Sequence, residues 1–298
     1  MDRFSQMSIF VAVVDSGSFA KAAQQLLMSP SGVTRAIAAL EQRLGILLLS
    51  RNTRRVQLTD AGRRFAQDCK RILLELDDAS EASRGVQDEL SGPLLVSAPV
   101  LFGEQVLTPI VSEFLAQHPK VQLRLLLSDQ LVNLADEGIH VALRIAPAQS
   151  GYELSETVGF VRRVVCASPT YVAEHGAPET PQQLLTHKLI DAQTVGPWAF
   201  VEGHSMFQLP ITPWLRVNAN QAALAAAEAG AGITRLMSYQ VAPALAAGRL
   251  QLLLTDYQTA TIPVQLVCPA GRRPTPKTLR FVEFCARQLR GHPALLTE

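Results

Sequence analysis

The chain has 298 residues, of which 48% are hydrophobic, and a formal net charge of +1, so its length allows about two or three folded units. It contains no uninterrupted apolar run of the roughly 18 residues that a membrane span requires, and no basic segment followed by an apolar run opens it. We therefore expect a cytoplasmic protein with no secretion signal and no membrane partner.

Residues 18–44 are predicted to form two helices joined by a tight turn. Ser18 is a suitable N-cap, because its side-chain oxygen can accept a hydrogen bond from an amide of the first turn. Pro30 cannot continue the first helix but suits the first turn of the second, for which Ser29 is the N-cap. Gly45 follows the second helix, and glycine is favoured just past a helix C-terminus.

The start of the second helix carries small polar residues and an arginine on its exposed side, namely Ser31, Thr34 and Arg35. Such a helix is typical of proteins that read the DNA major groove, although a helical hairpin that merely packs is the alternative. Residues 4–14 form an amphipathic helix that would complete a three-helix core, and residues 46–59 look like two short strands around a basic tip. These flanks favour a winged helix–turn–helix, whose tip places positive charge near DNA phosphates. The basic residues of that tip are Arg51, Arg54 and Arg55.

The small net charge hides an uneven distribution along the chain. Residues 1–65 hold nine Lys/Arg against four Asp/Glu, a net charge of +5, whereas residues 66–90 hold three against seven, a net charge of −4. The remaining residues hold fifteen of each. The basic excess therefore falls on the segment assigned to DNA, as an electrostatic footprint should.

A long helix is predicted from Thr59, a suitable N-cap, to about residue 87. Its apolar positions recur at spacings of four and three with one polar break: Phe65, Cys69, Ile72, Leu76, Ala79, Ser83, Val86 and Leu90. This heptad pattern predicts that two copies of the chain associate along the helix. The alternative is that the helix packs on the C-terminal part of its own chain.

From residue 93 onward short apolar strands alternate with amphipathic helices. Their order over residues 94–145 predicts a mostly parallel sheet with helices on both faces. A longer strand at residues 158–167 would lead into a second lobe, and residues 263–268 would return the chain to the first. Two α/β lobes joined by two crossovers would enclose a cleft.

Three segments of the N-terminal part read F-V-A-V-V-x-S-G-S-F-A-x-A-A, S-P-S-G-V-T-R-A-I-A-A-L-E-x-R-L-G and R-x-T-R-R-V-x-L-T-x-A-G. They resemble the DNA-binding domain of LysR-type transcriptional regulators. One departure is Gly32, where the family usually has alanine; glycine costs roughly 0.5–1 kcal/mol inside a helix, so we expect local fraying there. The expected DNA-binding residues are Ser29, Pro30, Ser31, Thr34 and Arg35 in the helix, and Arg51, Thr53, Arg54 and Arg55 in the wing.

The C-terminal part carries G-P-L-L-V-S-A-P, L-A-D-E-G-I-H-V-A-L-R-I, A-S-P-T-Y-V and A-G-A-G-I, which also resemble LysR-type regulators. The resemblance implies a fold similar to periplasmic solute-binding proteins, with a small-molecule effector between the lobes. It also implies a homodimer or homotetramer on a dyad-symmetric site in double-stranded DNA, with RNA polymerase as a further partner. The expected divisions are a winged helix–turn–helix at 1–58, a linker helix at 59–90 and an effector domain at 91–298, with lobe I at 91–160 and 263–298 and lobe II at 161–262. The overall class is α/β with an all-α N-terminal head.

Ligands of open α/β sheets bind at the carboxyl ends of strands, near helix N-termini. The residues that this rule places at the cleft are Ser97, Ala98, Pro99, Val100, Phe102, Ser128, Asp129, Arg144, Ile145, Thr194, Asn218, Ala219, Ile233 and Thr234.

Several of these residues have a second interpretation. Ser97 can cap a turn, Phe102 and Ile145 can belong to the core, and Arg144 can pair with an acidic residue of its own lobe. Arg235 falls where the family commonly has an apolar run. It favours an anionic effector if its side chain faces the cleft, and implies nothing if it faces solvent.

No signature of catalysis emerges from the sequence. The six histidines show no HExxH or i,i+4 pairing, and the chain lacks a GxSxG elbow, a GxGxxG loop and a Walker loop. The cysteines lack metal-site spacing and are expected to be buried or inert thiols rather than a redox switch: Cys69, Cys166, Cys268 and Cys285. We therefore expect no enzyme, no metal and no cofactor.

The favoured function is a sequence-specific, ligand-responsive transcriptional regulator, with two weaker rivals. A solute-binding protein would not need residues 1–59 and would carry a secretion signal. A DNA-binding protein that needs no effector would leave the two-lobed half without a purpose.

Overall fold

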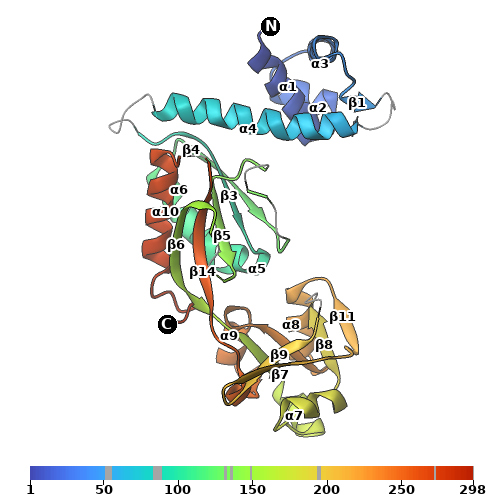
Figure 1. Ribbon diagram of the computed structural model, residues 1–298, viewed down its shortest axis with the longest axis vertical. Helices are drawn as coiled ribbons and strands as arrows, with labels where there is room; N and C mark the ends of the chain where they lie inside the picture. Colours follow the sequence, from blue (N-terminus) through green and yellow to red (C-terminus); the bar gives the residue numbers. More distant parts are fainter. Residues whose placement is uncertain are drawn as a thin grey trace.

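The computed structural model describes residues 1–50, 56–82, 89–130, 133–134, 137–147, 150–192, 196–271 and 273–297. Along the chain, a small helical head is followed by one long helix and then by two α/β lobes, stacked along the longest axis of the molecule (Figure 1). None of the helices among these residues combines the length and the apolar character needed to cross a bilayer.

The head consists of three helices and a two-stranded antiparallel sheet: α1 (Arg3–Ser16), α2 (Phe19–Gln25), α3 (Pro30–Leu44), β1 (Leu49–Ser50) and β2 (Gln57–Leu58). Its core contains Phe10, Val33 and Leu48, all fully buried. The sequence predicted this three-helix core and the paired strands of the wing. The wing tip, residues 51–55, lies outside the described residues.

The helix ends of the head follow from their capping residues. The Ser18 side chain accepts a hydrogen bond from the amide of Lys21 at 3.4 Å, and that of Ser29 accepts one from Gly32 at 3.1 Å. Gly45 ends α3 in the left-handed conformation at φ 70°, which only glycine adopts at little cost. Helix α3 is continuous through Gly32, so the fraying expected there is not present.

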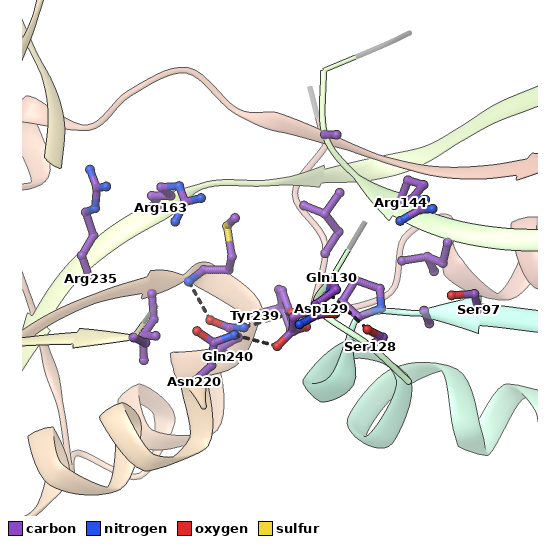
Figure 2. Close-up of a pocket in the computed structure, with 18 of the residues that line it drawn as sticks. Ser97, Ser128, Asp129, Gln130, Arg144, Arg163, Asn220, Arg235, Tyr239 and Gln240 are labelled. Atoms are coloured by element: carbon purple, nitrogen blue, oxygen red, sulfur yellow. Dashed lines mark hydrogen bonds between the residues drawn. The ribbon is translucent and has the colours of Figure 1, made fainter. Parts of the chain in front are cut away.

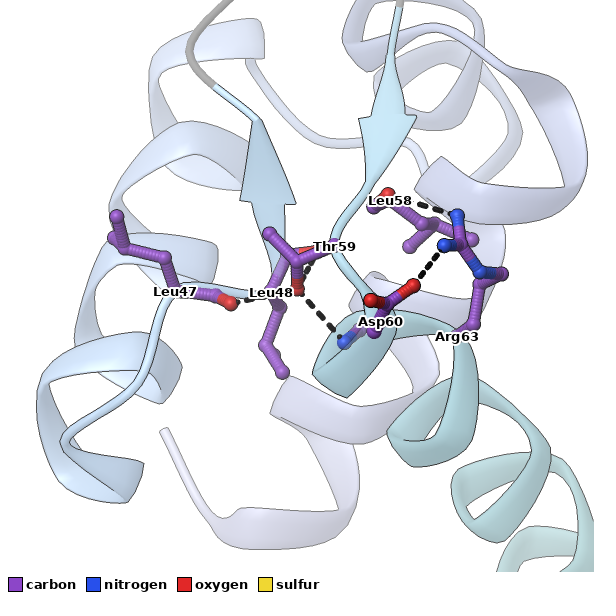
Figure 3. A network of polar contacts seen from close by, with 7 residues as sticks. Leu47, Leu48, Leu58, Thr59, Asp60 and Arg63 are labelled. Carbon is purple, nitrogen blue, oxygen red and sulfur yellow. Dashed lines mark hydrogen bonds and ion pairs between the residues drawn. The ribbon is translucent and has the colours of Figure 1, made fainter.

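The long helix α4 (Asp60–Ala82) begins at a compact junction with the wing (Figure 3). The Thr59 hydroxyl accepts a hydrogen bond from the amide of Gly62 at 2.9 Å and donates one to the carbonyl of Leu47 at 2.8 Å. The Thr59 amide also donates to the carbonyl of Leu48 at 3.0 Å. Thr59 is therefore the predicted N-cap of α4, and it also ties the helix to the segment that precedes β1.

The heptad pattern of α4 is divided among three environments, which corrects the prediction of one continuous seam. Cys69 is fully buried in the head core, and the Phe65 ring packs against Phe10 with centroids 5.7 Å apart. Leu90 is not helical and packs against the core of the first lobe. Of the remaining positions, Ser83 and Val86 lie outside the described residues, and Leu76 is 41% exposed.

Lobe I is built on one five-stranded sheet with the order β4-β3-β5-β14-β6. Its elements are β3 (Gly92–Ala98), α5 (Val100–Phe102), the π-helix η1 (Gly103–Leu107), α6 (Thr108–Gln117), β4 (Val121–Leu127), β5 (Val141–Ile145), β6 (Tyr152–Val161), β14 (Ile262–Pro269) and α10 (Pro276–Leu289). Strand β3 pairs in parallel with β4 and β5, but β14 pairs antiparallel with both β5 and β6. The sheet is therefore mixed rather than mostly parallel, because the chain returns from lobe II in the opposite direction.

Lobe II is built on a second five-stranded sheet with the order β11-β8-β12-β7-β13. Its elements are β7 (Arg163–Ala167), α7 (Pro169–His175), η2 (Pro181–Thr186), β8 (Leu189–Ala192), β9 (Trp198–Glu202), β10 (Ser205–Leu209), β11 (Leu215–Val217), α8 (Asn220–Glu228), β12 (Ile233–Met237), α9 (Ser238–Ala246), β13 (Gln251–Leu253) and η3 (Thr255–Tyr257). The single strand predicted over residues 158–167 is two strands, β6 and β7, interrupted at Arg162.

Arg162 lies where the chain passes between the lobes. Its amide donates to the Ser238 hydroxyl at 3.3 Å, and the Ser238 amide donates to the Arg162 carbonyl at 2.8 Å. Its guanidinium donates to the side chain of Gln258 at 3.1 Å. These bonds hold the first turn of α9 against the crossover.

Candidate functional site

Helix α3 lies at the head end of the molecule (Figure 1), and the polar residues at its start are exposed. All five residues expected to contact DNA from this helix are exposed: Ser29, Pro30, Ser31, Thr34 and Arg35. The remaining expected DNA contacts lie outside the described residues: Arg51, Thr53, Arg54 and Arg55.

Two hydrogen bonds within α3 orient these side chains. The Thr34 hydroxyl donates to the carbonyl of Pro30 at 3.0 Å, and Arg35 Nε donates to the carbonyl of Ser31 at 3.4 Å. Among the described residues, the terminal nitrogens of Arg35 have no protein acceptor. They are therefore able to donate to a base edge or a phosphate, the two acceptors that DNA offers an arginine.

A cavity of about 260 Å³ lies between lobe I and lobe II. Its walls come from the carboxyl ends of β3, β4 and β5 on one side and from β7, β12 and the first turns of α8 and α9 on the other. Of the residues expected at the cleft, those that line it are Ser97, Ala98, Pro99, Ser128, Asp129, Arg144, Ile145 and Asn218. The rule that ligands gather at strand ends thus located the lobe I wall well.

Five expected residues do not line the cavity, and for three of them the cause is burial. Phe102 is fully buried in lobe I, and Ile233 is fully buried in lobe II. The Thr234 side chain is also fully buried and donates to the carbonyl of Ile190 at 3.0 Å. Val100 and Ala219 are each one residue away from a lining position. Thr194 lies outside the described residues.

The lobe II wall was largely missed. Eight lining residues of lobe II were not placed at the cavity by the sequence analysis, and neither were Gln130, Leu143 and Ala146 of lobe I. The eight are Arg163, Ala192, Asn220, Arg235, Leu236, Met237, Tyr239 and Gln240. Five of these eight belong to β12 and α9, which the sequence analysis had not predicted. On a strand, an error of one residue moves a side chain to the opposite face, and for this reason Thr234 was expected where Arg235 lies.

Among the described residues that line the cavity, the charged ones are three arginines and one aspartate. Figure 2 shows Arg163 and Arg235 on the lobe II wall and Arg144 with Ser97 on the lobe I wall. Asp129 accepts a hydrogen bond from the amide of Val100 at 3.0 Å in lobe I and one from the Asn220 side chain at 3.3 Å in lobe II. The single carboxylate is therefore engaged in a contact between the lobes.

The sequence left open whether the Arg235 side chain faces the cleft or solvent. It lines the cleft and is only 7% exposed. Its Nη1 atom donates to the carbonyl of Ala199 at 3.1 Å, and its guanidinium lies 5.2 Å from the ring centre of Trp198. Burial and, to a smaller extent, the positive charge of Arg163 lower the pKa of Arg235 to about 10, against the opposing effect of Asp191. Arg235 therefore stays charged at neutral pH.

Aromatic packing also joins the lobes below the cavity. The rings of Phe102 in lobe I and Tyr239 in lobe II meet edge to face with centroids 5.2 Å apart. Gln240 donates to the Tyr239 hydroxyl at 3.1 Å and, through its side-chain oxygen, accepts from the amide of Met237 at 3.0 Å. The start of α9 is thus fixed at the base of the cleft.

A chain that carries both a groove-reading helix and a two-lobed ligand cleft is, by class, a DNA-binding regulator that responds to a small molecule. Two family models match it: "Bacterial regulatory helix-turn-helix protein, lysR family" over residues 4–63 and "LysR substrate binding domain" over residues 87–290. The protein belongs to the LysR family of transcriptional regulators.

Individual relatives agree with this assignment. The chain is 31% identical to the transcriptional activator AaeR of Escherichia coli K12, covering 89% of this chain and 86% of AaeR. It is 30% identical to a transcriptional regulator of Xanthomonas campestris, covering 94% of this chain and 84% of that protein. The solved structure of CrgA from Neisseria meningitidis is 29% identical with a TM-score of 0.61, covering 96% of this chain and 98% of CrgA. These relatives are regulators of transcription and not enzymes.

Proposed function

We propose that this regulator contacts DNA through the exposed start of α3 and through its wing, and that a small anionic effector binds in the cleft between the lobes. The observation that carries the proposal is the separation of the two surfaces. The head has a net charge of +5 over residues 1–65, and the cavity of about 260 Å³ has three arginines and one aspartate as its charged residues within the described part of the chain. The expected divisions at residues 58 and 90 are part of this proposal. The protein would act in the cytoplasm, at promoters where RNA polymerase is its further partner.

We also propose that the protein acts as a homodimer through the part of α4 beyond the head, with tetramers formed through the lobes. Leu76 supports this proposal, because it is a large apolar side chain that is 41% exposed on a heptad position of α4. Two-fold symmetry in the protein would match a dyad in the DNA site and double the number of contacts.

The DNA contact is tested by replacing Arg35 with alanine in the full-length chain. Selection from random duplexes should first yield a preferred site for the unaltered protein. On that site, Arg35→Ala should cost on the order of 1–3 kcal/mol and relax the base preference at one position. Fluorescence anisotropy at fixed salt concentration measures both effects, since salt alone changes such affinities.

The matched control is Arg43→Ala, an exposed arginine in the last turn of the same helix. It removes the same charge from the end of α3 opposite to the proposed contacts, so base preference should remain that of the unaltered protein. If Arg35→Ala retains both affinity and preference, Arg35 is not a DNA contact. If the unaltered protein prefers no duplex over random competitor, the proposed function fails.

A further inference from the structure

Arg163 and Arg235 lie on one face of the lobe II sheet. Strands β7 and β12 are antiparallel neighbours in which Arg163 pairs with Met237 and Arg235 pairs with Val165. Residues two apart on a strand point to the same face, so the two arginine side chains project from the same side of adjacent strands. Both side chains line the cavity (Figure 2), and burial lowers the pKa of each guanidinium.

Within the described part of the chain, neither guanidinium has a carboxylate within ion-pair distance. The nearby Asp191 forms its ion pair with Arg216 instead, at 3.6 Å. Arg235 is more than nine-tenths buried, and its Nε atom has no hydrogen-bond acceptor. The only acceptor that the Arg235 guanidinium has among the described residues is the neutral carbonyl of Ala199. A buried charge that no carboxylate neutralises at ion-pair distance is costly, so this arrangement suits a counter-charge from outside the chain.

We propose that the effector is a small organic acid whose carboxylate binds between Arg163 and Arg235 in lobe II. This inference rests on the proposed function, and it names the chemical class of the ligand and its anchor. A guanidinium matches a carboxylate because its donors fit two oxygens at once. On the opposite wall, in lobe I, the side chains of Ser97, Ser128 and Gln130 would bind hydroxyl or carbonyl groups on the rest of the molecule.

The competing interpretation is that Arg235 is only a structural link between β12 and β9. Its hydrogen bond to the carbonyl of Ala199 and its contact with Trp198 fit such a link. The two interpretations differ in one respect that can be measured. A structural arginine is needed for folding whether or not a carboxylate is present, whereas an anchor changes the response to carboxylates.

The protein contains its own optical reporter of this site. It has two tryptophans, and Trp198 lies 5.2 Å from the Arg235 guanidinium whereas Trp214 is 61% exposed. In the full-length Trp214→Phe variant, emission therefore comes from Trp198 alone. We would titrate this variant with acetate, succinate and benzoate and, separately, with the corresponding neutral amides.

At least one carboxylate should change Trp198 emission with saturation and raise the melting temperature, and its amide should do neither. Arg235→Met and Arg163→Met should each weaken that carboxylate at least about tenfold, as expected for the loss of a charge-assisted hydrogen bond. The matched control is Arg280→Met, which removes a guanidinium that is 61% exposed on α10 and outside the cavity. Its affinity for the carboxylate should be unchanged. Arg163 is only partly buried, so Arg163→Met keeps the test open if Arg235→Met does not fold.

The proposal is overturned if no carboxylate of the panel binds, if the amides bind equally well, or if both cleft variants bind like Arg280→Met. DNA selection on the same preparation separates this result from the proposed function. Carboxylate binding without any DNA preference would contradict the regulator, and DNA preference without carboxylate binding would contradict only the anchor.

Discussion

Gly62 occupies a position where no side chain fits. A Cβ atom built on it would lie 2.0 Å from the carbonyl oxygen of Leu48, which is backbone and therefore unable to move aside cheaply. The same close approach lets the Thr59 hydroxyl reach the Gly62 amide. Because Gly62 has no side chain, the backbone of Leu48 can lie directly against the first turn of α4.

Gly62→Ala should destabilise the head by about 1–3 kcal/mol, the usual cost of forcing extra atoms into packed structure. Calorimetric unfolding of the full chain should show the head transition at a lower temperature. Gly32→Ala is the matched control, because Gly32 is likewise the third residue of its helix. Its Cβ would meet side-chain atoms and no backbone, namely Ser29 Oγ at 3.1 Å and Met28 Cε at 3.6 Å. That control should change stability by less than about 1 kcal/mol. Equal effects of the two variants would contradict the steric argument.

Among the elements, α4 connects the head to the two lobes. Its apolar side chains have different surroundings at the two ends of the helix. Its first turns complete the head core through Phe65 and Cys69, while later turns extend beyond the head. Only these later turns are candidates for contact with a second copy of the chain. The self-association surface is therefore shorter than the heptad pattern suggested.

Leu76→Asp should convert the protein to monomers in sedimentation velocity, since a charge would have to be buried in the proposed helix pair. Glu75→Gln, at the adjacent exposed position, is the control and should leave the dimer intact. A stable Leu76→Asp dimer would place the principal interface elsewhere.

The elements that could be predicted from sequence are those specified by local signals. Pro30 at the start of α3 and Gly45 just past its end bound that helix where the capping residues indicated, and Thr59 caps α4 as expected. The position of Leu90 against lobe I and the insertion of β14 between β5 and β6 could not be predicted. They depend on contacts between segments far apart in the chain, which periodicity does not encode. The same limit explains why Ser97 was placed at the cleft and Arg163 was not.

At the scale of the whole molecule, the lobes are held together by a few contacts around the cavity. The hydrogen bond from Asn220 to Asp129 spans the lobes at its edge, and the Phe102 and Tyr239 rings meet at its base. Because a single hydrogen bond contributes only about 0.5–1.5 kcal/mol, this arrangement allows a ligand to change the relative positions of the lobes. Such a ligand acts only through its difference in affinity for the two states.

Asn220→Ala should shift the lobes toward a more open arrangement in the absence of ligand. Spin labels on the two lobes, read by double electron–electron resonance, should then report longer and broader distances. Asn218→Ala removes a neighbouring amide that also lines the cavity and should leave the distances unchanged. Identical distributions for Asn220→Ala and the unaltered protein would mean that this bond does not restrain the lobes.

The junction at Thr59 has a mechanical consequence for how the regulator uses its effector. Because the carbonyls of Leu47 and Leu48 are bound directly to the residue that starts α4, the wing cannot turn independently of that helix. Any rotation that the lobes impose on α4 passes to the wing as the same rotation. A small angular change at the sensor end thereby becomes a change in the direction from which the head approaches the double helix.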